Sequence, residues 1–181
     1  MLHLNDLKDM INNLSFVITE EDVERHDNEW KSVKGYTDKS GYSSRENLDS
    51  EYVEEYLSST YPSLVKITKK PNKFFADISF GEHQIDFKEI AGKWFNTKHD
   101  LIRYFDAVQK GLLTHFLFYR TDRPRGDNNF PTVISPGTTL NCEFLCAVTP
   151  YALFSCNKDK YNRINIYDIM YKAGESPDCI V

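Results

Sequence analysis

The chain has 181 residues and a mass of 21.1 kDa, a length that fits one domain with a sizeable core. Hydrophobic residues make up 40% of it and aromatic residues 14%, which excludes a disordered chain. The net charge of −5 excludes nucleic-acid binding by bulk positive charge, although it permits a local basic cleft. No apolar run approaches the roughly 18 residues of a membrane helix, and residues 1–13 lack the apolar core of a signal peptide.

The elements expected first along the chain are helical. Leu4, Leu7, Met10, Ile11 and Leu14 recur at helical spacing and predict a short amphipathic helix. Residues 19–49 are polar and predict a loop region around one poorly defined helix. A capping-box pattern at Ser43 and Glu46 then opens a further helix, which stops at Tyr61-Pro62.

The sequence changes character after this helix. We expect strands over residues 64–67, 74–80, 84–90, 112–119, 142–148 and 163–167. The run 112–119 is almost continuously apolar, which is typical of a strand covered on both faces. Residues 97–110 have a helical period, and this helix has the right length for a right-handed crossover between strands 84–90 and 112–119.

The expected fold is therefore α/β (α+β), with a mixed β-sheet core flanked by helices. We expect a single domain over residues 1–181, with a β-rich C-terminal extension over 130–181. All four cysteines lie in the last quarter of the chain, and no CxxC pair or nearby histidine completes a zinc site. This pattern favours reduced, buried thiols in a cytoplasmic protein that does not bind membranes.

The expected strands 74–80 and 84–90 are close enough in sequence to form a β-hairpin, and the turn between them predicts which residues pair. Gly81-Glu82 fits a two-residue type II′ turn, because glycine stands at the first central position. Paired residue numbers then sum to 163, which places Ile78 opposite Ile85 and Ala76 opposite Phe87. One face of the hairpin is therefore largely apolar.

The other face of the hairpin carries charge. The same register places Asp77 opposite Asp86 and Phe75 opposite Lys88. Two directly opposed carboxylates have Cβ atoms about 5 Å apart, and they repel unless a proton or cation lies between them. Mg²⁺ or Mn²⁺, completed by water and phosphate oxygens, resolves this conflict. Lys88 could then orient the attacking water, lower its pKa, or stabilise charge on the phosphate.

Asp77, followed nine residues later by Asp86-Phe87-Lys88 on the next strand, resembles the motif of the PD-(D/E)xK nuclease superfamily, which includes many restriction endonucleases. The core of that superfamily is a helix, an antiparallel hairpin, a second helix and a parallel strand, which matches about residues 44–120 here. The resemblance implies that Asp77 and Asp86 are metal ligands and that Lys88 is the catalytic lysine. Ala76 stands where the family often has proline.

The same resemblance suggests two helical residues. Family members often add a glutamate from the preceding helix to the metal site, and Glu51, Glu54 and Glu55 lie on that helix. Glu55 borders its apolar stripe and is our choice, with a solvated helix surface as the alternative. Gln109 resembles a glutamine that some relatives place near the scissile phosphate, although Leu113 replaces its usual tyrosine partner.

Basic residues near the predicted site are candidates for binding nucleic acid. Lys93, Lys98, Arg123 and Arg125 could neutralise phosphates, and a solvated loop explains the two arginines equally well. Trp94 is most simply a packing residue, though beside the site it could stack on a base.

These patterns lead to one expected function and two alternatives. The leading hypothesis is a Mg²⁺- or Mn²⁺-dependent endonuclease acting on DNA, restriction-type or phage-related, working as a homodimer. The first alternative is an RNA endonuclease of the same superfamily, in which His26 is an extra Mn²⁺ ligand as in RNA-cleaving relatives from viral polymerases. The second is a non-catalytic binding protein on the same scaffold.

Overall fold

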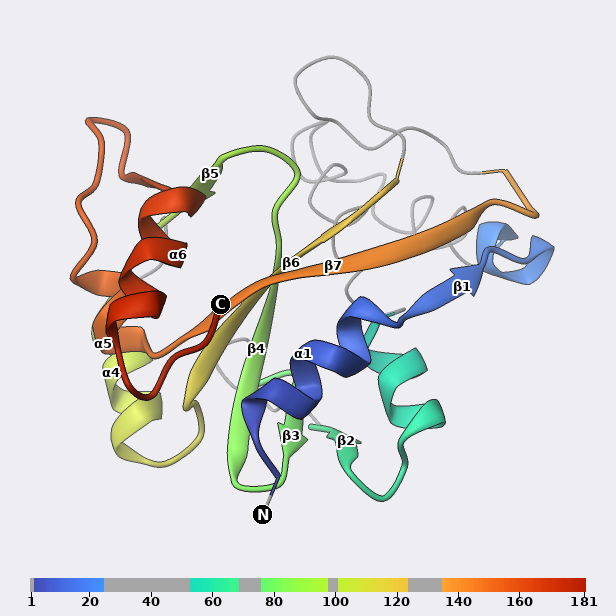
Figure 1. Ribbon diagram of the computed structural model, residues 1–181, viewed down its shortest axis with the longest axis horizontal. Coiled ribbons are helices and arrows are strands. Elements are labelled where there is room, and N and C mark those ends of the chain that lie inside the picture. Colours follow the sequence, from blue (N-terminus) through green and yellow to red (C-terminus); the bar gives the residue numbers. More distant parts are fainter. Residues whose placement is uncertain (1, 25–52, 69–75, 98–100, 124–134) are drawn as a thin grey trace, which may run out of the picture.

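The computed structural model describes residues 2–24, 53–68, 76–97, 101–123 and 135–181. These residues form a mixed α/β structure in which helices flank a curled sheet (Figure 1). The labelled helices are α1 (Leu4–Asn12), α4 (Leu101–Gln109), α5 (Pro150–Phe154) and α6 (Ile166–Glu175). Further helical turns cover residues 20–24 and 53–60.

The strands form two sheets. The larger has the order β1-β7-β6-β4-β3-β2, and the smaller pairs β5 with β8. Their bounds are β1 Ser15–Val17, β2 Val65–Ile67, β3 Ile78–Phe80, β4 His83–Glu89, β5 Trp94–Asn96, β6 His115–Thr121, β7 Thr139–Val148 and β8 Arg163–Asn165.

The predicted helical connection between two parallel strands is confirmed. β4 and β6 are parallel neighbours, and α4 lies between them in the chain. The other described strand pairs are antiparallel, so the main sheet is mixed. β6 lies between β4 and β7, and five of its seven residues in succession are buried, as expected for a strand covered on both faces.

Two apolar clusters form the core on the two faces of β6. Leu117 and Tyr119 belong to the first cluster and Phe116 and Phe118 to the second, because successive side chains of a strand point to opposite faces. Residues of α1 and of helix 53–60 pack in the first cluster, and residues of α4, α5 and α6 pack in the second.

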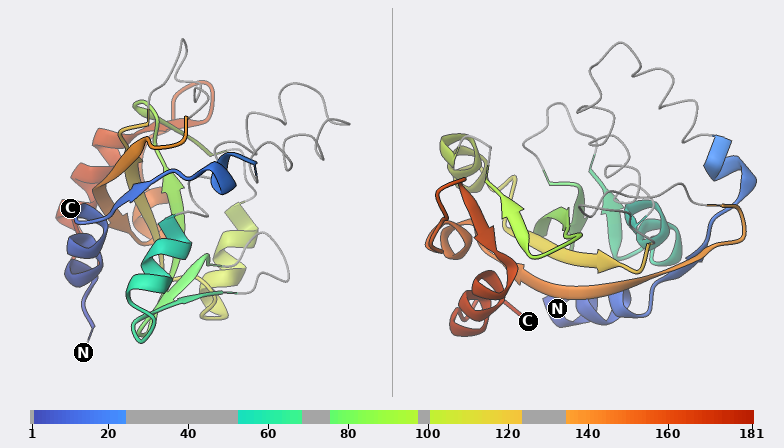
Figure 2. Two further views of the ribbon diagram at one scale, coloured as in Figure 1. Left: turned by 90° about the vertical axis from the view of Figure 1, so that its right-hand side faces the viewer. Right: turned by 90° about the horizontal axis from the view of Figure 1, so that it is seen from above.

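β7 is the longest strand, and it contains a bulge. Phe118 of β6 pairs with Cys146, but the next residue of β6 pairs with Phe144, so Leu145 is an additional residue. Leu145 and Cys146 consequently both pack in the second cluster. Figure 2 shows β7 bending along the curled sheet.

The expectation of a β-rich C-terminal extension is wrong in part. The strand expected over 163–167 ends at Asn165, whose side chain accepts a hydrogen bond from the backbone N–H of Tyr167 at 3.0 Å and so caps α6. Ile166, Ile169 and Ala173 then lie on the buried side of that helix. α5 and α6 gather with α4 at one end of the sheet (Figure 1).

Other expectations for the chain are confirmed where the structure describes them. α1 follows the predicted apolar stripe, and helix 53–60 ends just before Tyr61. The four cysteines are free, and three of them are buried. None of the described helices has the length and apolar character needed to cross a membrane.

A buried histidine makes the stability of this fold depend on pH. Nε2 of His115 donates to the carbonyl oxygen of Asp178 at 2.7 Å, and Nδ1 lies 2.9 Å from the hydroxyl of Thr114. Burial lowers the pKa of His115, against the opposing effect of the hydrogen bond to Asp178. The unfolded chain therefore takes up a proton at higher pH than the folded protein does, and stability falls as pH drops below about 6.5.

We expect His115→Gln to remove this acid-induced loss, which is on the order of 1 kcal/mol. Urea denaturation at pH values from about 7.5 to 5 gives the free energy of unfolding at each pH. The loss is the difference between the parent and the variant in how steeply this free energy falls as the pH is lowered. His3→Gln, at an exposed position beside α1, is the control and should leave the slope unchanged. Parallel pH profiles for the parent and His115→Gln would contradict the prediction.

Candidate functional site

The hairpin has the register that the turn predicted. Ile78 pairs with Ile85 and Phe80 with His83, so paired numbers sum to 163 as expected. Gly81 has a φ of +59°, while Glu82 is not among the residues with positive φ. This combination fits the type II′ turn and excludes type I′, which needs positive φ at both central positions.

The strand pairing ends at Ile78, so the expected pairings of Asp77 with Asp86 and of Ala76 with Phe87 are wrong, and Phe75 lies outside the described residues. β3 begins only at Ile78. The backbone N–H of Ala76 donates to the carbonyl oxygen of Leu112 at 3.4 Å, and Ala76 packs in the second cluster instead of opposite Phe87. The chain therefore bends at Asp77 instead of continuing along the hairpin.

The bend directs the Asp77 carboxylate to the edge of β4. Its Oδ2 accepts a hydrogen bond from the backbone N–H of Phe87 at 2.7 Å, while its own backbone N–H donates to the carbonyl oxygen of Ile85 at 2.7 Å. The side-chain oxygen of Asp77 thus accepts the hydrogen bond from the backbone N–H of Phe87, in the place of the backbone carbonyl oxygen of a paired strand. Asp77 is buried and lies close enough to Asp86 to interact with it by charge and by hydrogen bonding.

Asp86 and Lys88 form an ion pair on the second-cluster face of β4. Nζ of Lys88 lies 2.8 Å from Oδ1 of Asp86, and the two side chains are 24% and 10% exposed. The ammonium also lies 5.8 Å from the ring centroid of Phe116 on β6, within the range of a cation–π interaction. Because both partners are largely desolvated, the pair is electrostatically much stronger than one at the surface.

The electrostatics of the site favour a cation between the two carboxylates. Burial raises the pKa of Asp86 above its ordinary value and Lys88 opposes this rise, while the charge and hydrogen bonding of the nearby Asp77 add to it, and together these effects place the pKa at about 6. Burial opposes the charged form of Lys88 and is the largest single effect, but Asp86, Tyr104 and Asp77 together outweigh it and raise the pKa of this amine above its ordinary value. Lys88 is therefore an ammonium ion at neutral pH, suited to stabilising negative charge and not to removing a proton.

Sequence reasoning missed Tyr104 of α4. This buried residue stacks edge-on against Phe116 at 5.0 Å between ring centroids. Burial raises the pKa of its hydroxyl, Lys88 lowers it, and Asp86 and Asp77 raise it, so the phenol lies within electrostatic range of all three charged groups. The sequence does place Tyr104 beside the apolar stripe of α4. A tyrosine at such a position brings its hydroxyl group to the face of the sheet that the helix covers.

The donor set fits a hard divalent cation in part. Two adjacent carboxylates are the anionic oxygen ligands that Mg²⁺ and Mn²⁺ take, with water and phosphate oxygens filling other positions. Within the described residues, no group of three or more His, Cys, Asp or Glu side chains is arranged to hold a metal ion. Glu55 is thus not brought together with Asp77 and Asp86, and its side chain is exposed, whereas its neighbour Glu54 is buried.

The other predicted residues are dispersed. Gln109 is exposed at the end of α4. Lys93 is exposed, with its Nζ 5.6 Å from the ring centroid of Trp94. Arg123 was expected either to neutralise phosphates or to lie in a solvated loop. The solvated loop is wrong for this residue, because it is only 5% exposed and lies two residues after the buried strand β6, and its role in binding phosphates stays a prediction.

Lys98, Arg125 and His26 lie outside the described residues. Asp77, Asp86 and Lys88 are thus the predicted residues that the structure brings together, with Tyr104 added. Their geometry carries the functional argument alone, because comparisons of the chain with protein-family models, curated proteins and solved structures find no match.

Proposed function

We propose that the chain is a metal-dependent endonuclease that hydrolyses phosphodiester bonds, with DNA as the favoured substrate. The observation that carries this proposal is the buried pair of Asp77 and Asp86 with the Lys88 ammonium 2.8 Å from Asp86. The order of helix, antiparallel hairpin, crossover helix and parallel strand supports a restriction-endonuclease-like fold around it.

Each residue then has a defined task. Asp77 and Asp86 would hold Mg²⁺ or Mn²⁺, which supplies Lewis-acid stabilisation of phosphate charge and a water of lowered pKa. The hydrogen bond from Phe87 N–H keeps the Asp77 carboxylate oriented. Lys88 stabilises the negative charge that accumulates on the phosphate oxygens, and Asp86 holds its ammonium in place.

The proposal predicts that Asp86→Asn and Lys88→Ala lose Mg²⁺-dependent DNA cleavage by at least about a hundredfold. The measurement is the rate of nicking of supercoiled plasmid with Mg²⁺ or Mn²⁺. Asp106→Asn is the matched control, because Asp106 forms an ion pair with Lys110 at the same 2.8 Å distance but on the exposed surface of α4. Cleavage by both site variants at the parent rate would refute the site assignment.

Two alternatives have distinct tests. RNA cleavage would replace DNA cleavage if the substrate is RNA, and His26→Ala should then weaken it. A non-catalytic binding protein is favoured by the absence, among the described residues, of a third metal-ligating side chain beside the two aspartates. In that case Mn²⁺ should give no thermal stabilisation of the parent protein, and no nuclease activity should accompany binding.

A further inference from the structure

The smaller sheet presents an outer face that the proposed chemistry does not use. Phe95 of β5 pairs with Ile164 of β8, and both side chains pack inward in the second cluster. Because side chains alternate along a strand, Trp94 and Arg163 belong to the opposite face. Trp94 is 37% exposed, a large fraction for a tryptophan at the edge of a core.

Cations and aromatic rings alternate on this face. The guanidinium carbon of Arg163 lies 4.6 Å from the ring centroid of Trp94 and 5.0 Å from that of Tyr161. Nζ of Lys93 lies 5.6 Å from the Trp94 ring, and Nζ of Lys160 lies 4.9 Å from the Tyr161 ring. We call these five residues the aromatic–cationic platform, and Tyr161 is its most exposed aromatic member, at 61%.

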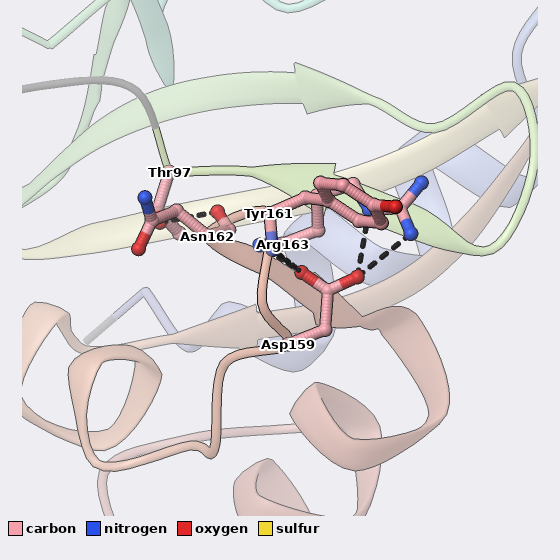
Figure 3. A network of polar contacts seen from close by, with 5 residues as sticks. All are labelled: Thr97, Asp159, Tyr161, Asn162 and Arg163. Atoms are coloured by element: carbon pink, nitrogen blue, oxygen red, sulfur yellow. Dashed lines mark hydrogen bonds and ion pairs between the residues drawn. The ribbon is translucent and has the colours of Figure 1, made fainter.

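A network of hydrogen bonds holds the centre of the platform, as Figure 3 shows. Oδ2 of Asp159 accepts from Nε and Nη2 of Arg163 at 2.9 and 2.7 Å, and Oδ1 accepts from the backbone N–H groups of Tyr161 and Arg163. Asn162 takes a φ of +58°, and its carbonyl oxygen accepts from Oγ1 and the backbone N–H of Thr97. The turn is therefore tied to the end of β5, and Asp159 holds the Arg163 guanidinium beside the Trp94 and Tyr161 rings.

The chemistry of the platform selects one class of partner. Three cations stand against the single carboxylate of Asp159, so the surface has a local charge of +2 in a chain of net charge −5. Exposed rings bind flat π-systems, while lysines that rest on those rings can move to a phosphate. We propose that the aromatic–cationic platform binds single-stranded nucleic acid, with bases stacked on Trp94 and Tyr161 and phosphates neutralised by the two lysines.

A duplex is a poorer partner for this surface, because its bases are already stacked on one another and present only their edges. An acidic peptide would satisfy the cations but would leave the ring faces without a stacking partner. Single strands satisfy both groups at once, which is why rings interleaved with basic residues are typical of such binding surfaces.

The smaller sheet and the carboxylate site lie on the same face of the main sheet, and the platform is on the outer side of the smaller sheet. Phe95, behind Trp94, stacks edge-on against Phe118 at 5.1 Å, and Lys88 lies over Phe116 on the same side of β6. Trp94 lies six positions after Lys88, a span of at most about 22 Å of extended chain. A strand bound at the platform can therefore reach Asp77 and Asp86 within a few nucleotides. This extension rests on the proposed nuclease function, whereas the binding itself does not.

The test is binding without catalysis. Affinity for fluorescent oligothymidine and oligouridine of about 15 nucleotides is measured with the full chain in EDTA. We expect Trp94→Ala and Tyr161→Ala each to weaken binding of the preferred oligonucleotide roughly 5- to 100-fold. Trp94→Phe should keep most of the affinity, because it retains a ring. In a Trp30→Phe background Trp94 is the sole tryptophan, and its fluorescence should be quenched on binding.

Tyr171→Ala is the matched control, since this tyrosine of α6 is 70% exposed and lies outside the platform. Circular dichroism of each variant verifies that it has folded. Unchanged affinity in Trp94→Ala and Tyr161→Ala, or equal affinity for duplex or for polyglutamate, would overturn the platform. If the parent binds the strand through Trp94 but cleaves nothing, the nuclease proposal fails and the platform stands; if it cleaves but the two variants bind normally, the reverse holds.

Discussion

Lys88→Met is expected to lower the free energy of unfolding by about 3–5 kcal/mol near neutral pH without metal, because it leaves a buried carboxylate with no counter-ion. Methionine keeps much of the volume of the lysine stem, so the loss reports charge more than packing. Asp86 is 10% exposed and lies 2.8 Å from the amine that the substitution removes. Urea denaturation at constant pH measures the change.

The loss in Lys88→Met should depend on pH in a defined direction. The pKa of Asp86 is about 6 with Lys88 present, and removing the ammonium raises it further. An acid whose pKa is raised by folding costs no stability below its unfolded pKa of about 4, and it costs most above its folded pKa. The variant should therefore recover on acidification, and Asp86→Asn combined with Lys88→Met should recover at all pH values.

An exposed pair provides the comparison for this effect. Lys110→Met breaks an ion pair of the same length whose side chains are 61% and 58% exposed. Because water screens such pairs, its loss should be within about 0.5 kcal/mol. Equal losses in the two methionine variants, or a loss in Lys88→Met that does not change with pH, would show that the Asp86–Lys88 pair is not desolvated as described.

Asp77→Asn is expected to abolish Mn²⁺-dependent stabilisation and cleavage while making the metal-free protein more stable. The amide oxygen of asparagine can still accept from the N–H of Phe87, as Oδ2 of Asp77 does at 2.7 Å. The substitution removes a negative charge that raises the pKa of Asp86. Relief of this repulsion should raise the free energy of unfolding by on the order of 1 kcal/mol above pH 7.

Thermal denaturation with and without Mn²⁺ measures both parts of this result. Asp77→Ala separates them, since it also removes the charge but leaves the N–H of Phe87 without its partner, at a cost of about 1–3 kcal/mol. A metal-free Asp77→Asn protein less stable than the parent would mean that the two carboxylates do not repel. Full Mn²⁺ stabilisation in that variant would mean that Asp77 is not a ligand.

Much of the site follows from local sequence, because a two-residue turn determines which strand positions face each other. Gly81 specified the turn, and counting from it placed Asp86 and Lys88 on one face. Counting failed at Ala76, where the chain bends to bond the carbonyl oxygen of Leu112, a residue from a different part of the chain. Tertiary contacts of this kind leave no periodic signal in the strand itself.

The same limit explains what was missed in the fold. α6 begins with Ile166-Tyr167, residues that favour strands, and its helical state depends on the Asn165 cap and on burial against the second cluster. Tyr104 joined the site only because the crossover lays α4 over Phe116. β1 and β5 are three residues each, too short for an alternating pattern to identify.

The additional residue in β7 has a geometric consequence for the whole sheet. Before Leu145, the even-numbered residues Leu140 and Phe144 pack in the first cluster; after it, the odd-numbered Ala147 does. The additional residue thereby exchanges the faces of the sheet to which the odd- and even-numbered side chains of β7 point. A bulged strand is also longer than its partner and must arc around it. The difference in length between β7 and β6 thus contributes to the curl of the sheet in Figure 2, because the longer strand must bend to stay paired with the shorter one.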